Sequence, residues 1–209
     1  MKNLIKGLHK FQTEVFPIQK NFFQELAKGQ TPEILFITCS DSRVNPNLVT
    51  SSEPGDMFII RNAGNIVPLY GANGGEQATI EFAVTELMVQ DIILCGHSFC
   101  GAIQASTQLE RYKHMPSLIH WVQQHIEPTL ALVKENYPNL DDAALLDVLT
   151  QEHVLRQVEN LKTHPTVSKK VAEGTLALHA WIYTFETGEI LAYNVQEGQF
   201  ERISSRVEK

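Results

Sequence analysis

Cysteine and runs of basic residues are both scarce in this sequence of 209 residues. Only three cysteines occur, Cys39, Cys95 and Cys100, and an odd, small number is a poor basis for a disulfide framework. Free thiols are typical of a reducing compartment, where they are often buried, catalytic or metal-binding. The chain has no cluster of Lys and Arg, and its formal net charge is −7. This balance argues against a nucleic acid or an anionic membrane surface as a partner.

Long apolar runs are missing as well. No window approaches the roughly 18 uncharged apolar residues that a membrane span requires. Charged residues also interrupt the apolar positions of residues 1–23, so this segment lacks the unbroken stretch of a signal peptide. We therefore expect a cytoplasmic protein that does not enter a membrane.

The order of apolar segments predicts the fold. Three short runs have the nearly continuous hydrophobicity of strands buried on both faces: residues 33–38, 57–61 and 91–96. A helical pattern at 75–89 lies between the last two, which favours a parallel β-α-β arrangement. Residues 176–185 and 190–195 predict two further strands around a turn. The sequence thus predicts an α/β fold with a central, mostly parallel sheet of four to five strands flanked by helices.

We expect one domain over residues 1–209, because no linker, repeat or low-complexity segment divides the chain. Its predicted parts are an N-terminal helical arm (1–30), an α/β core (31–110), a helical region (111–174) and C-terminal strands (175–209). In the arm, apolar residues recur every three or four positions, and Pro17 predicts a break. The pattern suits packing on the protein's own core and packing on a partner subunit equally well.

Each of the three buried strands runs into a cluster of reactive or special residues. These clusters are Cys39-Ser40-Asp41-Ser42-Arg43, Arg61-Asn62-Ala63-Gly64-Asn65 and His97-Ser98-Phe99-Cys100-Gly101. In open α/β sheets, ligands bind outside the carboxyl ends of the strands. The three clusters are therefore expected to meet at one place.

Cys39, His97 and Cys100 form a candidate metal site at that place. His97 and Cys100 are three residues apart, so a helical turn beginning there would direct both side chains to one point. Zinc accepts thiolate and imidazole ligands, and three protein ligands with one open position are the catalytic pattern. A structural zinc normally has four protein ligands, and the sequence offers no fourth Cys or His at a suitable spacing.

Taken singly, these residues have simpler interpretations. A lone Cys at a strand end is usually a small buried hydrophobe, and Cys95, inside the third run, is interpreted in that way. The remaining histidines are interpreted as surface or core residues rather than ligands: His9, His114, His120, His125, His153, His164 and His179. It is the combination of the His-x-x-Cys pair with the Cys-x-Asp-x-Arg motif that indicates a metal site.

Asp41 and Arg43 are spaced for a bidentate contact between a carboxylate and a guanidinium group. One interpretation is a purely structural ion pair. The other starts from the proximity of Asp41 to Cys39, since an unpaired carboxylate could occupy the open metal position. Arg43 would then decide whether water or Asp41 is held there, and our hypothesis is that breaking the pair switches the enzyme off.

The motifs CSDSR (39–43), RNAGN (61–65) and GHSFCGA (96–102) resemble those of the β-class carbonic anhydrases. The resemblance covers most of the chain, and residues 26–102 are most similar to the plant and cyanobacterial branch.

This resemblance implies one Zn²⁺ per subunit, held by Cys39, His97 and Cys100, and a catalytic dyad of Asp41 and Arg43. The implied reaction is the reversible hydration of carbon dioxide to bicarbonate and a proton, by water that the zinc activates. It also implies a homodimer or a higher homo-oligomer, and we therefore expect the arm to pack on a partner subunit. The core over residues 31–110 would be the zinc-binding part.

The resemblance also implies a substrate pocket. Its predicted substrate-binding residues are Gln30, Phe58, Ala63, Phe82 and Gly101. Gln30 would reach across a dimer interface, the apolar side chains suit a nonpolar gas, and backbone donors near Gly101 would hold its oxygens.

Two residues depart from the family pattern. Phe82 stands where many members have Tyr, which removes a hydroxyl group near the site. Phe36 stands where the bicarbonate-inhibited bacterial branch has Trp, so the allosteric pocket of that branch is expected to be absent.

Two other functions stay open on the sequence alone. One is a hydrolase of carbonyl sulfide or carbon disulfide on the same scaffold, since both molecules are isosteric with carbon dioxide. The other is a catalytically silent, zinc-binding scaffold subunit. Carboxysome-associated relatives add a bacterial microcompartment as an alternative location.

Overall fold

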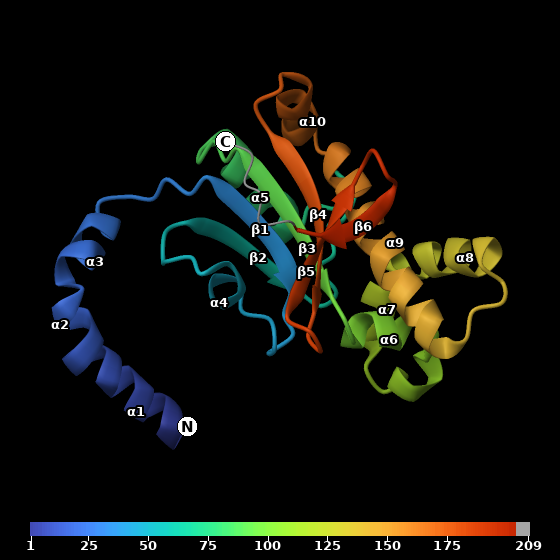
Figure 1. Ribbon diagram of the computed structural model, residues 1–209, viewed down its shortest axis with the longest axis horizontal. Helices are drawn as coiled ribbons and strands as arrows, with labels where there is room; N and C mark the ends of the chain where they lie inside the picture. Colours follow the sequence, from blue (N-terminus) through green and yellow to red (C-terminus); the bar gives the residue numbers. More distant parts are fainter. Residues whose placement is uncertain (204–209) are drawn as a thin grey trace.

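The computed structural model describes residues 1–203 (Figure 1). Within that range six strands form one sheet, in the order β2-β1-β3-β4-β5-β6. They are β1 (Ile34–Cys39), β2 (Met57–Asn62), β3 (Asp91–His97), β4 (Ala177–Thr184), β5 (Glu189–Asn194) and β6 (Gln199–Arg202). Strands β1 to β4 are parallel to one another, whereas β5 is antiparallel to β4 and β6 is antiparallel to β5. The mostly parallel α/β fold is confirmed, with six strands instead of four to five.

Strand β6 is the one that the sequence did not predict. It has four residues with a single apolar side chain, Phe200, and such a segment carries no strand pattern. The strand forms because β5 offers a free edge, along which Asn194 pairs with Gln199 and Leu191 with Arg202. The predicted C-terminal region (175–209) continues into residues 204–209, which lie outside the described residues.

Local signals in the sequence set most helix boundaries. The helices after β1 are α4 (Pro46–Thr50), α5 (Gly75–Thr85), α6 (Gly101–Thr107), α7 (Pro116–His125), α8 (Glu127–Asn136), α9 (Asp142–Lys162) and α10 (Pro165–Ala172), with a 3₁₀ turn at Leu109–Tyr112. Pro128 separates α7 from α8 and lies in the first turn of α8, where a missing N–H costs nothing. Asp141 caps α9 by accepting a hydrogen bond from the Ala144 N–H at 2.9 Å.

Helices α5, α9 and α10 cover one face of the sheet. α9 contacts β3 and β4, α5 contacts β2, and α10 packs on both helices. The shared core includes Leu35, Ile92 and Leu94, which are fully buried. Gly96 permits the close approach of α9, because a Cβ there would lie 2.5 Å from Cγ2 of Val154.

The opposite face carries a smaller apolar cluster. Its buried members are Phe36, Ile93 and Cys95, and half-buried Ile34, Met57, Ile59, Trp181 and Tyr183 pack around them. The first part of the N-terminal arm stands away from the sheet (Figure 1), whereas Leu26 at its end lies beside Gly55 in the loop before β2.

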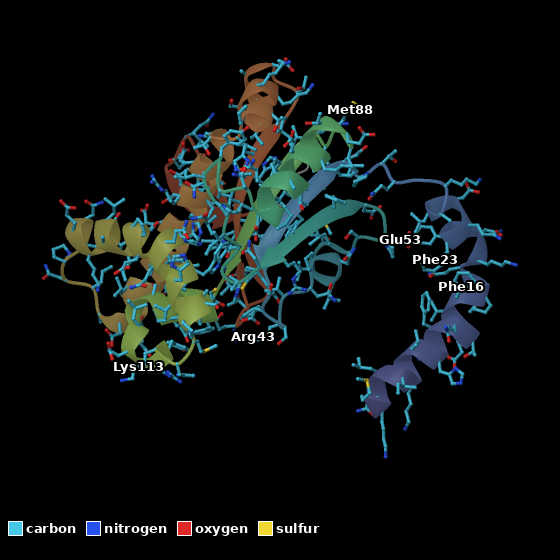
Figure 2. All side chains as sticks on the ribbon, turned by 180° about the vertical axis from the view of Figure 1, so that it is seen from behind. Phe16, Phe23, Arg43, Glu53, Met88 and Lys113 are labelled. Carbon is cyan, nitrogen blue, oxygen red and sulfur yellow. The ribbon has the colours of Figure 1, made fainter. Side chains whose placement is uncertain are left out.

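The arm consists of α1 (Lys2–Lys10), a π-helical segment (Phe11–Val15), α2 (Phe16–Ile18) and α3 (Lys20–Leu26). Pro17 cannot donate a backbone hydrogen bond, so the regular ladder is interrupted in the preceding turn. The rings of Phe16 and Phe23, labelled in Figure 2, stack with centroids 5.5 Å apart and join the two halves of the arm. None of the helices in residues 1–203 has the length and apolar character needed to cross a membrane.

Candidate metal centre

The carboxyl ends of β1, β2 and β3 lie at the same end of the sheet, as the sequence predicted. Figure 2 shows Arg43 at this end and Met88 at the other end. Cys39 is the last residue of β1, His97 is the last residue of β3, and Cys100 directly precedes α6. Parallel pairing in register, with Thr38 opposite Cys95, brings these strand ends together.

The three predicted ligands form one compact, buried group. One donor atom from each of Cys39, His97 and Cys100 lies within 4.8 Å of the others, and the two Sγ atoms are 3.9 Å apart. Two thiolates on a tetrahedral zinc, with Zn–S bonds of about 2.3 Å, would be separated by about 3.8 Å. This is the only such group of Cys, His and acidic residues found among the residues that the structure describes.

His97 has the orientation of a metal ligand. Its Nδ1 lies 2.8 Å from the carbonyl oxygen of Ser98, a contact that places the proton on Nδ1 and leaves a lone pair on Nε2. Nε2 is buried and has no hydrogen-bond partner within residues 1–203. A buried acceptor without a partner is costly, and a cation between Nε2 and the two thiols would satisfy it. The donor set therefore fits zinc.

The turn between His97 and Cys100 differs from the helical turn that the sequence suggested. His97 ends a strand, and α6 begins only at Gly101. The chain reverses at Phe99, whose φ of 55° lies in the left-handed region that a non-glycine residue rarely adopts. The carbonyl of Phe99 accepts a hydrogen bond of 3.1 Å from Nη2 of Arg43, which helps to hold this turn.

The loop after β2 supports Cys39. Arg61 donates to the carbonyl oxygens of Cys39 and Asp41, at 2.9 and 2.8 Å, and so fixes the backbone after β1. The Gly64 N–H lies 3.3 Å from Sγ of Cys39. Gly64 has a φ of +88°, and a Cβ there would lie 3.0 Å from that of Ala102, so both its backbone and its neighbour favour glycine.

The two ligand thiols shift each other's pKa in opposite directions, because their Sγ atoms lie 3.9 Å apart. The pKa of Cys39 is lowered, first because the Cys100 thiol donates a hydrogen bond to it and also by contacts with His97 and the Gly64 N–H. The pKa of Cys100 is raised for the complementary reason, and burial raises it further. Zinc binding therefore has to displace the proton of Cys100. Burial also raises the pKa of Cys95 to about 12, as expected for a core thiol.

Asp41 and Arg43 form the bidentate pair that their spacing predicted. Nε and Nη2 of Arg43 donate to the two carboxylate oxygens of Asp41 at 2.9 and 2.7 Å. These hydrogen bonds hold the pKa of Asp41 well below its usual range, so the carboxylate is charged at neutral pH. Oδ2 of Asp41 lies 3.9 Å from Nε2 of His97, next to the three ligand atoms.

Of the five predicted substrate-binding residues, the structure places two beside the metal ligands. Ala63 precedes Gly64, and its carbonyl accepts a 2.9 Å hydrogen bond from Nε1 of Trp121. Gly101 follows Cys100, and nothing lies within 4 Å of the position of its missing Cβ.

The other three lie toward the opposite end of the sheet in the same chain. Phe58 pairs with Leu35, whereas the ligand Cys39 pairs with Asn62. Phe58 is therefore four residues, or about 13 Å along the strand, from the position opposite Cys39. Phe82 lies against Phe58, with ring centroids 5.9 Å apart. Gln30 precedes β1 and lines a groove of about 790 Å³ between the arm and the sheet. The chain therefore does not bring Gln30, Phe58 and Phe82 to its own ligand group.

Two residues that contact the site were not predicted from the sequence. Phe185 contacts both Arg43 and His97, although its sequence neighbourhood indicates only the end of a strand. His153 was interpreted correctly as a surface or satisfied core residue, but its hydrogen bond of 2.9 Å to the Gly64 carbonyl was not foreseen. The sequence does contain a signal for the role of His153, because His153, Gln157 and Asn160 form a buried polar row on one face of α9.

The buried group of Cys39, His97 and Cys100 at the carboxyl edge of a mostly parallel sheet could hold a metal ion, and three protein ligands are the pattern of catalytic zinc enzymes. The family model for carbonic anhydrase matches residues 34–190. A carbonic anhydrase of Synechocystis sp. is 46% identical over 209 residues, which cover 99% of this chain and 76% of that protein. The chain belongs to the β-carbonic anhydrase family of enzymes.

Solved structures agree with this assignment. The β-carbonic anhydrase CcaA matches with a TM-score of 0.93 at 45% identity, covering 97% of this chain and 99% of that one. A structure described as one of two tetrameric β-carbonic anhydrases from the ascomycete Sordaria macrospora matches with a TM-score of 0.73 at 30% identity, covering 91% and 92%.

Proposed function

We propose that the chain catalyses the reversible hydration of carbon dioxide to bicarbonate and a proton, with one zinc ion per subunit held by Cys39, His97 and Cys100. The observation that carries this proposal is the buried, unpartnered Nε2 of His97 facing two thiols 3.9 Å apart. A bound zinc ion supplies the Lewis acid that makes water nucleophilic near neutral pH. The two thiolates would neutralise its formal charge, which favours activity at mildly alkaline pH.

The surrounding residues would orient the reactants. Oδ2 of Asp41 is the carboxylate oxygen nearest His97, and it would accept a hydrogen bond from the attacking water. Backbone donors near Gly101, which directly follows Cys100, would hold the oxygens of the product.

A hydration assay with bound-metal analysis tests this proposal. Stopped-flow detection of proton release should show turnover with one zinc per chain, and Cys100→Ser should lose both zinc and turnover. Cys95→Ser, which changes the core thiol, is the matched control and should keep both. Zinc without any carbon dioxide turnover would instead support a silent scaffold, and sulfide release from carbonyl sulfide or carbon disulfide would support the related hydrolase.

Arg43 would control access to the fourth metal position. While it pairs with both oxygens of Asp41, the carboxylate is engaged by the guanidinium group, with Oδ2 3.9 Å from Nε2 of His97. Without that pairing, the carboxylate would be free to turn toward the metal and displace water. We expect Arg43→Ala to lower turnover at least tenfold with zinc retained. Arg202→Ala, which breaks a surface ion pair with Glu189, should have little effect. Full activity of Arg43→Ala would contradict the gating role.

We further propose that a second copy of the chain completes the pocket. Gln30, Phe58 and Phe82 lie too far from their own ligand group to complete it, and a partner subunit could receive them. Gln30 lines the groove beside the arm, and Phe82 is 44% exposed. Apolar residues of the arm are strongly exposed, Leu8 by 57% and Ile18 by 86%, which supports the same assembly.

Leu8→Glu tests the assembly. We expect this change to reduce the molar mass measured by light scattering and to lower turnover in parallel. Leu132→Glu on α8, where the leucine is 51% exposed, is the control and should change neither. A Leu8→Glu protein of unchanged mass, or a monomer with full turnover, would refute the proposed role of the partner.

A further inference from the structure

Phe185 reaches the metal centre from a distant part of the sequence. It directly follows β4, and its ring lies 4.4 Å from Cζ of Arg43. The same ring lies 5.0 Å from the ring of His97. Phe185 therefore touches both the arginine of the Asp41–Arg43 pair and one of the three ligands.

The ion pair of Arg43 with Asp41 is not expected to hold the Arg43 side chain in place by itself. Its side chain is 51% exposed, and ion pairs of exposed arginines are weak because water and side-chain entropy compete with them. A guanidinium over an aromatic face gains a cation–π attraction that water does not replace. Over the Phe185 ring, Arg43 donates to both oxygens of Asp41 and to the Phe99 carbonyl.

Phe185 is itself held by Ser98, the residue that directly follows His97. Its backbone N–H donates to Oγ of Ser98 at 3.0 Å, and that hydroxyl donates to the carboxylate of Glu186 at 2.8 Å. The Ser98 N–H donates to the carbonyl of Tyr183, and the Tyr183 ring meets the Phe185 ring edge-on at 5.0 Å. The end of β4 thus gives the ring a fixed place beside the site.

We propose that Phe185 is a positioning residue, which holds Arg43 on Asp41 and so keeps the Asp41 carboxylate out of the fourth metal position. This inference rests on the proposed zinc site. The turn after β4, which carries Phe185, would thus keep that site open to small molecules.

Anion binding to the cobalt-substituted protein tests the proposal without any measurement of turnover. Thiocyanate is the probe, and its dissociation constant is read from the visible spectrum of Co²⁺. Loss of the cation–π contact in Phe185→Leu should weaken thiocyanate binding about fivefold, since Asp41 would compete for the position. Phe185→Met provides a second aliphatic variant of similar size, and Phe185→Tyr, which keeps an aromatic face, should stay within about twofold of the parent.

Two comparisons separate this role from a general loss of structure. Phe200→Leu removes a ring that also packs in the C-terminal hairpin, 5.3 Å from Tyr193, and should leave thiocyanate binding unchanged. Asp41→Ala in the Phe185→Leu protein should restore binding to the level of Asp41→Ala alone.

The proposal is overturned if Phe185→Leu and Phe185→Met bind thiocyanate as tightly as Phe200→Leu does. It is also overturned if the weakening persists without the Asp41 carboxylate, or if the metal content falls below one per chain, because Phe185 would then only support the fold or His97. Failure of the proposed function has a different signature, namely a parent protein that binds cobalt and thiocyanate but does not hydrate carbon dioxide.

Discussion

The buried imidazole of His153 should make the protein measurably less stable in mild acid. His153 is 1% exposed on α9, and burial lowers its pKa from 6.5 to about 4. Between these two pH values the unfolded chain binds a proton on His153 that the native protein does not bind. Stability therefore falls as the pH drops from 6.5 toward 4. At 1.36 kcal/mol per pH unit, this single group should remove about 3 kcal/mol of unfolding free energy.

His153→Gln isolates this contribution. A glutamine amide can still donate to the Gly64 carbonyl but does not titrate, so the variant should lose about 1 kcal/mol at pH 7.5 through imperfect packing. The difference between parent and variant should then shrink as the pH falls and should reverse near pH 6, where the loss from His153 reaches about 1 kcal/mol. The unfolding free energies are measured by urea denaturation at fixed protein and zinc concentrations, so that other titrating groups cancel in the difference.

A constant difference between parent and variant from pH 7.5 to 4.5 would refute this reasoning. The exposed His120→Gln variant controls for the substitution itself, because it removes an imidazole that is not buried in the core. The expected acid sensitivity arises from a residue that the metal does not touch.

Two further predictions concern the sheet and the ligands. Gly96→Ala places a methyl group 2.5 Å from Cγ2 of Val154 and should cost about 1–3 kcal/mol in urea denaturation. Val154→Ala in the same protein should recover part of this loss, and Gly7→Ala, with open space around it, should cost nothing. Zinc affinity should rise with pH, up to tenfold per unit, because the proton on Cys100 must leave before zinc binds. Competition with a chromophoric chelator from pH 6.5 to 8.5 measures this, and a flat profile would contradict it.

Much of the fold could be predicted from local sequence patterns, because the predicted strands and helix boundaries are also those of the tertiary structure. The strands β1 and β3 were recognisable because a strand covered on both faces is apolar throughout. β2 lies at the edge of the sheet and is mostly half-buried, but its first four residues are also apolar. Pro128 and Asp141 act within one helical turn, so their effect on helix boundaries can be read directly. β6 escaped prediction because its order comes from the edge of β5 and not from its own side chains.

The sequence by itself determined the chemistry of the candidate site. Three soft ligands and an Asp–Arg pair stand next to buried strands, and parallel strands must bring their carboxyl ends together. Only the tertiary structure decided how the ligands are oriented, since Phe99 reverses the chain through a left-handed residue and leaves Nε2 of His97 without a partner.

Tertiary structure also decided which residues support the site. Phe185 lies more than 80 residues from His97 in the sequence, yet it contacts both His97 and Arg43 because β4 pairs with β3. The separation of Gln30, Phe58 and Phe82 from the ligand group is likewise set by the length of the strands. The sequence specifies which groups are available, and the pairing of distant strands determines which of them meet, because that pairing depends on contacts that no local pattern contains.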